Sequence, residues 1–536
     1  MLYHIRYIIA IIVMLLCSFL ASAQMNPKYK FEEALKLIQD NYVDEVNDER
    51  LVDSSIKAML SDLDPHSQYV GREEAEERRQ MMSGSFAGIG VQFLKSKDST
   101  YVVDVNPDGP AVRAGLKVGD LILAIDGAST SRKEIKNQDI MRMIRGEKGV
   151  PVVLTVKHPG MDAQREITIV RENILNKSVL ASYMVDKEIG YISLSIFTES
   201  TRTEVDEALK KLIGKGMKKL IFDLQSNGGG NVQSAIGVAD EFLPKEKLVF
   251  YSVTNTGVKD HYFTGGYGRF YDGPMVVLID ESTASSSEIV TGALQDWDRA
   301  VIVGRRSFGK GLMQKSFEMT DGSILMLTGA RYYTPTGRSI QKPYNKGKQD
   351  YFKDFERRMA SKELMDESVI SVADSLKYKT LTNSRIVYGG GGIIPDKFVP
   401  IDTVYYSGWM TKLMNSGLIN DLCFGYLKTR RVSILKDYPD FNKFKNEYVI
   451  SDEWINVLTQ SAARNKIQMP ATISENTARD LKIEIKAQMA ALLYTGDNYM
   501  IPIRNESNQS YLEAIKILKD KKEYARLLKI GNNHNK

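Results

Sequence analysis

The sequence predicts a multidomain protein of the mixed α/β class, and three observations support that prediction. The chain has 536 residues, which is more than one hydrophobic core accommodates. Between residues 189 and 304, short apolar runs typical of buried strands alternate with amphipathic helical segments, and this alternation indicates an α/β core. A glycine-rich stretch that favours strands precedes this core, and helical periodicity dominates both ends of the chain. We therefore expect a helical N-terminal module, a β-rich domain, an α/β core and a helical C-terminal extension.

The composition excludes several functional classes. Hydrophobic residues make up 43% of the chain and charged residues 26%, as in ordinary globular proteins. The net charge of +5 is small for this length, and a nucleic-acid ligand would favour a clustered basic face instead. The five histidines are scattered without metal-ligand spacing, so we expect neither a metal nor a cofactor. The only cysteines are Cys17 and Cys423, which excludes a disulfide framework.

The first 23 residues have the pattern of a cleavable secretory signal. A short basic segment with His4 and Arg6 precedes an apolar stretch at 7–20, and Ala-Ser-Ala at 21–23 provides the small residues of a cleavage site. Cys17 follows two leucines rather than small residues, which disfavours a lipoprotein anchor. We expect an exported protein that is soluble after cleavage, in the periplasm or secreted. The alternative is a membrane anchor formed by the uncleaved signal.

Residues 24–83 are expected to form a helical module. Phe31, Leu35 and Ile38 fall on one face at helical spacing. These apolar residues could pack within the module or against a second subunit. The segment DPHSQY at 64–69 interrupts the periodicity, and His66 within it is interpreted as a turn residue rather than a catalytic one.

Residues 84–172 are predicted to form a β-rich domain with short helices at 111–114 and 137–144. The string PAVRAGLKVGDLILAIDG at 110–127 resembles PDZ domains over its whole length. The resemblance implies a module that binds an extended peptide by strand addition and holds its terminal carboxylate with backbone N–H groups. A generic β-barrel with glycine turns is the alternative. By position, the residues that hold the carboxylate would be Phe86, Ala87, Gly88 and Ile89.

A strand, a tight turn and a helix are predicted in succession around Ser285. The apolar run 274–279 leads into TASSSE at 283–288, and helical periodicity follows. Ser285 would therefore lie at the positive end of a helix, where unsatisfied N–H groups can hold an oxyanion. The alternative is that the serines only cap the helix. A second apolar run, 300–304, precedes SFGKG at 307–311, which carries Lys310.

These motifs resemble those of the carboxyl-terminal processing, or tail-specific, proteases. TASSSE, FGKG and the interval of 25 residues between Ser285 and Lys310 match the family, as does Gln314 four residues after the lysine. The resemblance implies a crotonase/ClpP-like α/β protease core. It also implies Ser285 as nucleophile, Lys310 as general base and Gln314 as the residue that orients the lysine. Members of the family often dimerise through the N-terminal helical module.

The segment DLQSNGGG at 223–230 resembles the family pattern DLR-x-N-x-GG. Consecutive glycines after a buried strand permit the close backbone approach that an oxyanion hole needs. The resemblance implies that the N–H groups of Gly229 and Ser286 stabilise the oxyanion. Without the serine downstream, these glycines would be read as a flexible loop. Gln225 departs from the pattern, because the family usually has arginine there, and the salt bridge of that arginine is in question.

A lysine can act as a base only when its pKa is lowered, since an unperturbed lysine titrates near ~10.4. Burial disfavours the charged form. We therefore expect Lys310 to lie in an apolar pocket free of carboxylates. Its walls would be Phe308, Leu312 and Met313, while an inward-pointing Glu288 would oppose the effect. A glutamine amide can accept an N–H bond from the amine without adding charge.

The sequence thus predicts an exported serine endopeptidase that cleaves proteins near their C-terminal tails, with the PDZ domain binding an unstructured apolar C-terminus. A catalytically inactive PDZ adaptor is the alternative, although it should have lost the serine, the lysine or the glycines. A crotonase-like acyl-transfer enzyme would need a nucleotide-thioester pocket, for which no residues stand out. The substrate, a homodimer and an activating partner remain open. The resemblance covers residues 26–396, and the expected domains are 24–83, 84–172, 173–397 and 398–536.

Overall fold

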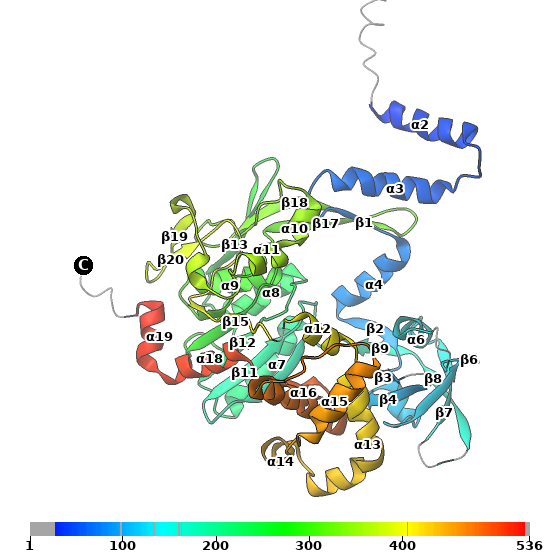
Figure 1. The fold of residues 1–536 in the computed structure, drawn as a ribbon. Coiled ribbons are helices and arrows are strands. Elements are labelled where there is room, and N and C mark those ends of the chain that lie inside the picture. Colours follow the sequence, from blue (N-terminus) through cyan, green and yellow to red (C-terminus); the bar gives the residue numbers. More distant parts are fainter. Residues whose placement is uncertain are drawn as a thin grey trace, which may run out of the picture.

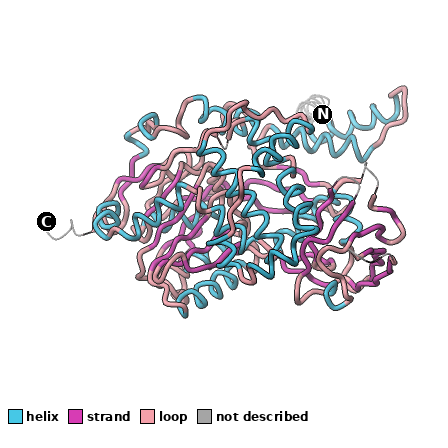
Figure 2. The backbone as a smooth tube through the Cα atoms, turned by 60° about the horizontal axis from the view of Figure 1, so that its bottom comes forward, coloured by secondary structure: helices cyan, strands magenta, loops and turns pink. Residues whose placement is uncertain are grey.

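The computed structural model describes residues 27–96, 99–131, 135–158, 161, 163–404 and 406–530. The predicted signal segment 1–23, with Cys17, lies outside the described residues. Within the described part of the chain, no helix is long and apolar enough to span a bilayer. Two separate groups of strands, one in the PDZ-like region and one in the core, are visible in Figure 2.

The N-terminal module is helical, as predicted, and its first helix projects from the body of the molecule (Figure 1). Helix α2 buries none of its residues. The predicted break at 64–69 is confirmed, because the helix before it ends at Ser61 and strand β1 begins at Gln68. Strand β1 then pairs antiparallel with β18 of the core. The elements are α2 (Pro27–Asn41), α3 (Asp48–Ser61), β1 (Gln68–Val70) and α4 (Arg72–Ser83).

The PDZ-like domain is a sheet of order β3-β4-β5-β7-β8, with β6 paired to β5 and two short helices beside it. The predicted helices at 111–114 and 137–144 correspond to α5 and α6. Its elements are β3 (Val91–Ser96), β4 (Ser99–Val105), α5 (Pro110–Arg113), β5 (Leu121–Ile125), β6 (Ala128–Ser129), α6 (Asn137–Ile144), β7 (Pro151–Lys157) and β8 (Gln164–Val170). Where the chain enters and leaves this domain, β2 (Ser85–Gly88) and β9 (Glu172–Leu175) pair as an antiparallel ribbon.

The core contains a six-stranded sheet of order β10-β11-β12-β15-β16-β21, parallel except for β10. The apolar runs of the sequence form the adjacent central strands of this sheet. Both faces of these strands are buried, which explains why the runs are continuously apolar. Helices α7, α8 and α9 cover one face and the late helices α18 and α19 cover the other. The elements are β10 (Val179–Met184), β11 (Ile189–Leu194), α7 (Thr201–Gly214), β12 (Lys219–Asp223), α8 (Val232–Asp240), β15 (Met275–Ile279), α9 (Ser286–Asp296), β16 (Val301–Gly304) and β21 (Lys397–Phe398).

A second sheet, of order β1-β18-β13-β14 with β17 paired to β18, adjoins the first. The sequence pattern at 323–333 predicts two strands, 323–327 and 329–333. They are one continuous strand, because Gly329 continues the extended backbone and pairing with β17 spans both halves. The elements are β13 (Leu248–Thr254), β14 (Lys259–Phe263), β17 (Leu312–Glu318) and β18 (Ile324–Tyr333).

The remaining chain is mainly helical and forms its own apolar cluster from α12 to α17. This cluster contacts the PDZ-like domain, where Phe424 lies with its ring centroid 4.7 Å from that of Tyr101. The elements are α10 (Lys348–Phe352), α11 (Asp354–Ala360), η1 (Glu367–Val369), η2 (Asp374–Leu376), β19 (Lys377–Lys379), β20 (Ile386–Tyr388), α12 (Gly408–Asn415), α13 (Leu418–Asp437), α14 (Phe441–Glu447), α15 (Glu453–Arg464), α16 (Glu475–Tyr494), α17 (Asp497–Arg504), α18 (Gln509–Lys519) and α19 (Lys521–Leu528).

Candidate active site

Ser285 occupies a strained turn between β15 and α9. Its backbone has φ 56° and ψ −116°, a region that residues with a side chain seldom adopt. The turn before it is fixed by Asp280, whose Oδ1 accepts the N–H groups of Ser282 and Thr283 at 3.0 Å each. Strand β15 therefore delivers the chain into a turn that places Ser285 at the N-terminus of α9, as the sequence predicts.

The three consecutive serines have different environments. Ser286 and Ser287 are fully buried. Their hydroxyls donate to backbone carbonyls of the glycine loop, Ser286 to Gly230 at 2.9 Å and Ser287 to Asn227 at 3.0 Å. Ser285 is only half-buried. The later two hydroxyls thus hold the glycine loop against α9, and Ser285 is the serine that reaches the surface of the site.

Glu288 links the serine turn to the lysine loop. It is fully buried, and its Oε2 accepts the backbone N–H of Ser285 at 2.9 Å and that of Lys310 at 2.8 Å. Its Oε1 accepts the Gly309 N–H at 2.7 Å and the Ser307 hydroxyl at 2.5 Å. Burial raises the pKa of this carboxyl, and the four donors oppose that rise. One carboxylate therefore fixes the backbone positions of Ser285 and Lys310 relative to each other.

The pKa of Lys310 is lowered to about 8, chiefly by burial and secondly by the positive charge of Arg78. The negative charges of Glu288 and Asp64 act in the opposite direction. Our expectation of a pocket without carboxylates is therefore wrong, because Glu288 does point inward. Burial nevertheless outweighs both charges.

Gln314 is not hydrogen-bonded to the Lys310 amine in this structure. Its Nε2 donates to the Leu312 carbonyl and to the Thr328 hydroxyl, each at 3.4 Å. Both distances exceed those of ordinary N–H···O bonds. A register shift between Met313 and Gln314, where β17 pairs with β18, lies directly beside this side chain. The structure thus brings Ser285 and Lys310 into one site and leaves Gln314 beside it.

The glycine loop lies directly against the serine turn. A Cβ atom added to Gly229 would lie 2.7 Å from the Cβ of Ser285 and 2.9 Å from the Ser286 nitrogen. The φ of Gly229 is +97°, which also requires glycine. The Gly229 N–H donates to Asn227 Oδ1 at 2.9 Å. An oxyanion role for Gly229 therefore requires this bond to be shared or broken.

The segment at 64–69 lies at the site, which the sequence analysis missed. Asp64 accepts the Thr328 hydroxyl at 2.9 Å, and His66 Nε2 lies 2.9 Å from the Tyr351 hydroxyl. Burial first and the charge of Lys310 second lower the pKa of His66 to about 4, so its ring is neutral at pH 7. The interpretation of His66 as a turn residue did not predict its contact with Tyr351. Its partner is 285 positions away in the chain, and no local pattern reveals such a distance.

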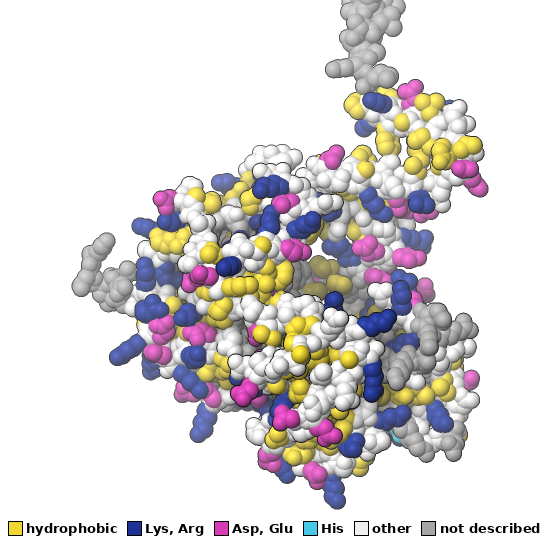
Figure 3. Space-filling model, in the orientation of Figure 1, with side chains coloured by type: hydrophobic (Ala, Val, Ile, Leu, Met, Phe, Trp, Pro, Cys, Tyr) yellow, Lys and Arg dark blue, Asp and Glu magenta, His cyan; other side chains and the backbone are white. Residues whose placement is uncertain are grey.

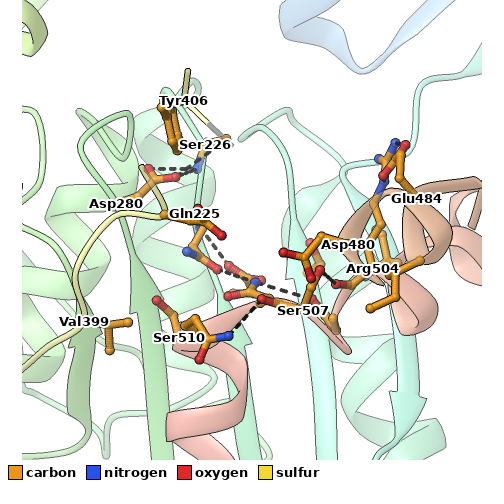
Figure 4. Close-up of a pocket in the computed structure, with 18 of the residues that line it drawn as sticks. Gln225, Ser226, Asp280, Val399, Tyr406, Asp480, Glu484, Arg504, Ser507 and Ser510 are labelled. Carbon is orange, nitrogen blue, oxygen red and sulfur yellow. Dashed lines mark hydrogen bonds and ion pairs between the residues drawn. The ribbon is translucent and has the colours of Figure 1, made fainter. Parts of the chain in front are cut away.

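Gln225, which replaces the family's usual arginine, contacts the C-terminal extension. Its Oε1 accepts the Nδ2–H of Asn508 at 2.9 Å. Both residues border a cavity of about 400 Å³ between the core and the extension. Figure 4 shows Gln225, Ser226 and Asp280 on the core side of this cavity, facing Arg504 and Ser507 of the extension. At the position where the family usually has arginine, this chain thus makes a neutral contact to its C-terminal extension.

The residues expected to hold a peptide carboxylate lie at the start of the PDZ-like domain. Phe86, Ala87 and Gly88 belong to β2, while Ile89 is fully buried in the domain core. The Arg145 guanidinium lies 4.2 Å from the ring centroid of Phe86, and it adds a positive charge to this corner. Strand β3, which follows, is an edge strand of its sheet and can accept a further strand.

Several known proteases are similar in sequence to this chain. A carboxy-terminal-processing protease from Bartonella bacilliformis is 38% identical over 320 residues, which are 58% of this chain and 72% of that protein. The chain belongs to the carboxy-terminal-processing protease family. Another member of this family, the processing protease CtpB of Bacillus subtilis, is 35% identical over 317 residues, 58% of this chain and 65% of that protein.

Family models match successive parts of this carboxy-terminal-processing protease. They describe an activating protease CtpB N-terminal domain at 20–74, a PDZ domain at 87–169 and peptidase family S41 at 188–348. A family of unknown function matches 409–496. A solved photosystem II D1 C-terminal processing protease has 27% identity and a TM-score of 0.33, and the match covers 58% of this chain and 89% of that one. The family models and the relatives similar in sequence confirm the predicted family and fold class, and the chain is a serine peptidase with a PDZ domain.

Proposed function

We propose that this peptidase cleaves exported proteins near their C-terminal tails, with Ser285 as nucleophile and Lys310 as general base. The observation that carries this assignment is the buried carboxylate of Glu288, which binds the backbone N–H groups of both residues. A lysine whose pKa is about 8 has a substantial neutral fraction near neutral pH and can accept the serine proton.

In the proposed reaction, the Ser285 hydroxyl attacks the scissile carbonyl and its proton passes to the neutral Lys310 amine. The N–H groups of Ser286 and Gly229 stabilise the tetrahedral oxyanion. Lys310 then donates the proton to the leaving nitrogen, which releases the C-terminal fragment and leaves an acyl-enzyme on Ser285. A water molecule, deprotonated by Lys310, then attacks this ester. The acyl group leaves as a carboxylic acid, and the proton on Lys310 passes to the Ser285 oxygen, which restores the free hydroxyl. We assign Gln314 the role of aiming the amine, which requires its two long contacts to be exchanged for one to Lys310.

The PDZ domain would select the substrate. A free carboxylate could bind to the backbone around Phe86–Ile89, near the Arg145 charge, while the tail adds as a strand to β3. Only an unstructured tail can adopt this extended form, so we expect folded C-termini to be spared. Residues 1–23 have the pattern of a secretory signal, and this supports a periplasmic or secreted location.

We also propose a homodimer through the N-terminal module. Helix α2 has exposed apolar side chains, among them Phe31, Leu37 and Ile38, at 43%, 56% and 42% exposure. Figure 3 shows apolar side chains gathered on this projecting part of the molecule. An exposed apolar helix favours a partner, and a second copy presents the same helix. Leu37→Glu should then shift the mass measured by light scattering from dimer to monomer.

The experiment that tests the proposed activity is incubation of the protein, lacking residues 1–23, with an unstructured test protein and mass mapping of the products. Ser285→Ala and Lys310→Ala should each abolish cleavage while circular dichroism remains unchanged. Ser287→Ala is the comparison variant. It loses the bond to the Asn227 carbonyl and should lower the rate of cleavage without abolishing it. Cleavage by Ser285→Ala with loss in Ser287→Ala would show that the nucleophile is misassigned. No cleavage by the wild type, with or without a candidate activator, would favour the inactive PDZ adaptor.

A peptide with a free apolar C-terminus, compared with the same peptide amidated there, tests tail recognition. We expect the free peptide to be cleaved faster at limiting concentration, because only it offers a terminal carboxylate. Equal rates would contradict recognition by the PDZ domain and leave a peptidase that selects unfolded sequence alone.

A further inference from the structure

A cavity of about 370 Å³ adjoins the turn that carries the candidate nucleophile. Gly228, which precedes the candidate oxyanion glycine, and Ala284, which precedes Ser285, form part of its lining. Phe308, two residues before Lys310, forms another part, and its N–H donates to the Thr283 carbonyl at 2.9 Å. The cavity therefore adjoins the glycine loop, the serine turn and the lysine loop at once.

The rest of the wall comes from α10 and α11, which contribute Phe352 and Phe355. These two helices begin at the end of the region that matches peptidase family S41, residues 188–348. Helix α11 is supported by Tyr406, whose ring centroid lies 5.9 Å from that of Phe355. The aromatic wall of this cavity is thus built from Phe352 and Phe355, which follow the matched residues 188–348, and from Phe308 within them.

The cavity offers apolar surface that water contacts at present. Phe352 is 50% exposed and Phe355 is 37% exposed. Aromatic rings left in water retain a large free energy of burial, which a ligand can use. The volume also lies in the range of roughly 300–1,000 Å³ that is common for ligand pockets.

The charged residues that line the cavity are already paired. Glu281 binds Arg305 at 2.6 Å, Arg358 binds Glu363 at 2.9 Å, and Asp354 lies 3.3 Å from Lys342. Because each charge has an opposite partner, the cavity gives no net attraction for a charged ligand. The exposed rings of Phe352 and Phe355 are its main apolar contact surface.

We propose that this cavity, lined by Phe308, Phe352 and Phe355, binds a large apolar side chain of the substrate residue that flanks the scissile bond. The proposal rests on the proposed peptidase activity at Ser285, since only that position puts the scissile bond at the cavity. The favoured side chains are those of phenylalanine, leucine and methionine. Charged and very small side chains are disfavoured, the former by desolvation and the latter by unfilled volume.

The test is a map of cleavage sites in an unstructured protein, followed by kcat/KM for peptides that differ only at the flanking residue. The wild type should show phenylalanine, leucine or methionine enriched at one position beside the cut. Phe352→Ala and Phe355→Ala should each reduce kcat/KM for the phenylalanine peptide by roughly ten-fold or more. The alanine peptide should change little. Phe263→Ala removes an equally exposed ring, 53% exposed, on the far strand β14 and should leave both peptides unaffected.

Two negative outcomes are distinguishable. Cleavage by the wild type without enrichment at either flanking position would overturn the pocket and leave the peptidase assignment intact. The same conclusion follows if both alanine variants keep the wild-type ratio between the phenylalanine and alanine peptides. Absence of any wild-type cleavage would overturn the peptidase assignment, and the pocket proposal with it. The cleavage-site map of the wild type uses no variant, so it can refute the proposed pocket even if a variant misfolds.

Discussion

Glu288→Gln separates the two effects of the buried carboxylate, which holds the backbone and places a negative charge near Lys310. The amide keeps one acceptor oxygen and replaces the other with an N–H₂ group. If the amide oxygen takes the place of Oε2, it still accepts the N–H groups of Ser285 and Lys310. The N–H₂ group then faces Ser307, whose hydroxyl can turn to accept, and the Gly309 N–H, which loses its acceptor.

The expected loss of stability follows from the one N–H group, that of Gly309, which loses its acceptor in the variant. One buried donor without an acceptor costs about 1–3 kcal/mol. Burial raises the pKa of Glu288, so removal of its charge offsets part of this cost. We expect the free energy of unfolding to fall by at most about 3 kcal/mol, which a typical domain of roughly 5–15 kcal/mol tolerates.

The effect on pH dependence has a definite sign. The Glu288 charge raises the pKa of Lys310, so its removal lowers that pKa below the wild-type value of about 8. The base works when neutral, and kcat/KM therefore rises as pH passes the lysine pKa. For a pKa of about 8, about a tenth of the lysine is neutral at pH 7, and this fraction increases in the variant. The rising limb of the profile should move to lower pH.

The assay is kcat/KM between pH 6 and 10 for the wild type, Glu288→Gln and the control Glu241→Gln. Glu241 is also a buried carboxyl, with a pKa raised to about 7 mainly by burial, but it does not act on Lys310. Its variant should keep the wild-type midpoint. An unmoved or higher midpoint in Glu288→Gln would refute the electrostatic reasoning. A folded but inactive Glu288→Gln would refute the claim that one acceptor oxygen suffices to hold the site.

Three further predictions concern the surroundings of the site. Asp64→Asn should also move the midpoint to lower pH, because the Asp64 charge raises the pKa of Lys310; a shift to higher pH in the kcat/KM profile would contradict this. Gly229→Ala should abolish cleavage, because its Cβ would lie 2.7 Å from the Ala284 oxygen, whereas Gly214→Ala, at the end of α7, meets nothing within 4 Å and should remain active in the same assay. Asn508→Ala should lower the free energy of unfolding by about 1–2 kcal/mol, because α18 loses its N-cap. In a double-mutant cycle with Gln225→Ala, measured by urea denaturation, the two losses should not add, because the two side chains are hydrogen-bonded at 2.9 Å.

The sequence was sufficient to predict the elements whose residues are close in the chain. The turn at Ser285 follows from an apolar run, small polar residues and helical spacing, which are all local signals. The PDZ-like helix at 137–144 was predicted with its observed bounds. The family motifs then gave each candidate catalytic residue a role that local patterns alone could not give.

What the sequence did not reveal depends on contacts between distant segments. Asp64 and Thr328 are 264 positions apart, and no periodicity connects them. The sequence also does not decide whether the Glu288 side chain points inward, because a glutamate in the first turn of a helix is usually explained by the helix dipole. Its burial is decided by the lysine loop that packs over it, which is a tertiary contact.

The C-terminal extension shows most clearly how tertiary packing changes the meaning of a segment without motifs. Helices α18 and α19 place Tyr511, Ile517 and Leu528 against the sheet that ends at the active site. Without them, one face of the parallel sheet would be in water, and parallel sheets are stable only when both faces are covered. The same segment begins with Asn508, which contacts Gln225 at the base of the glycine loop. The peptidase fold of this chain is therefore completed by residues 508–528, which lie 160 to 180 positions beyond the end of the match to peptidase family S41 at 348.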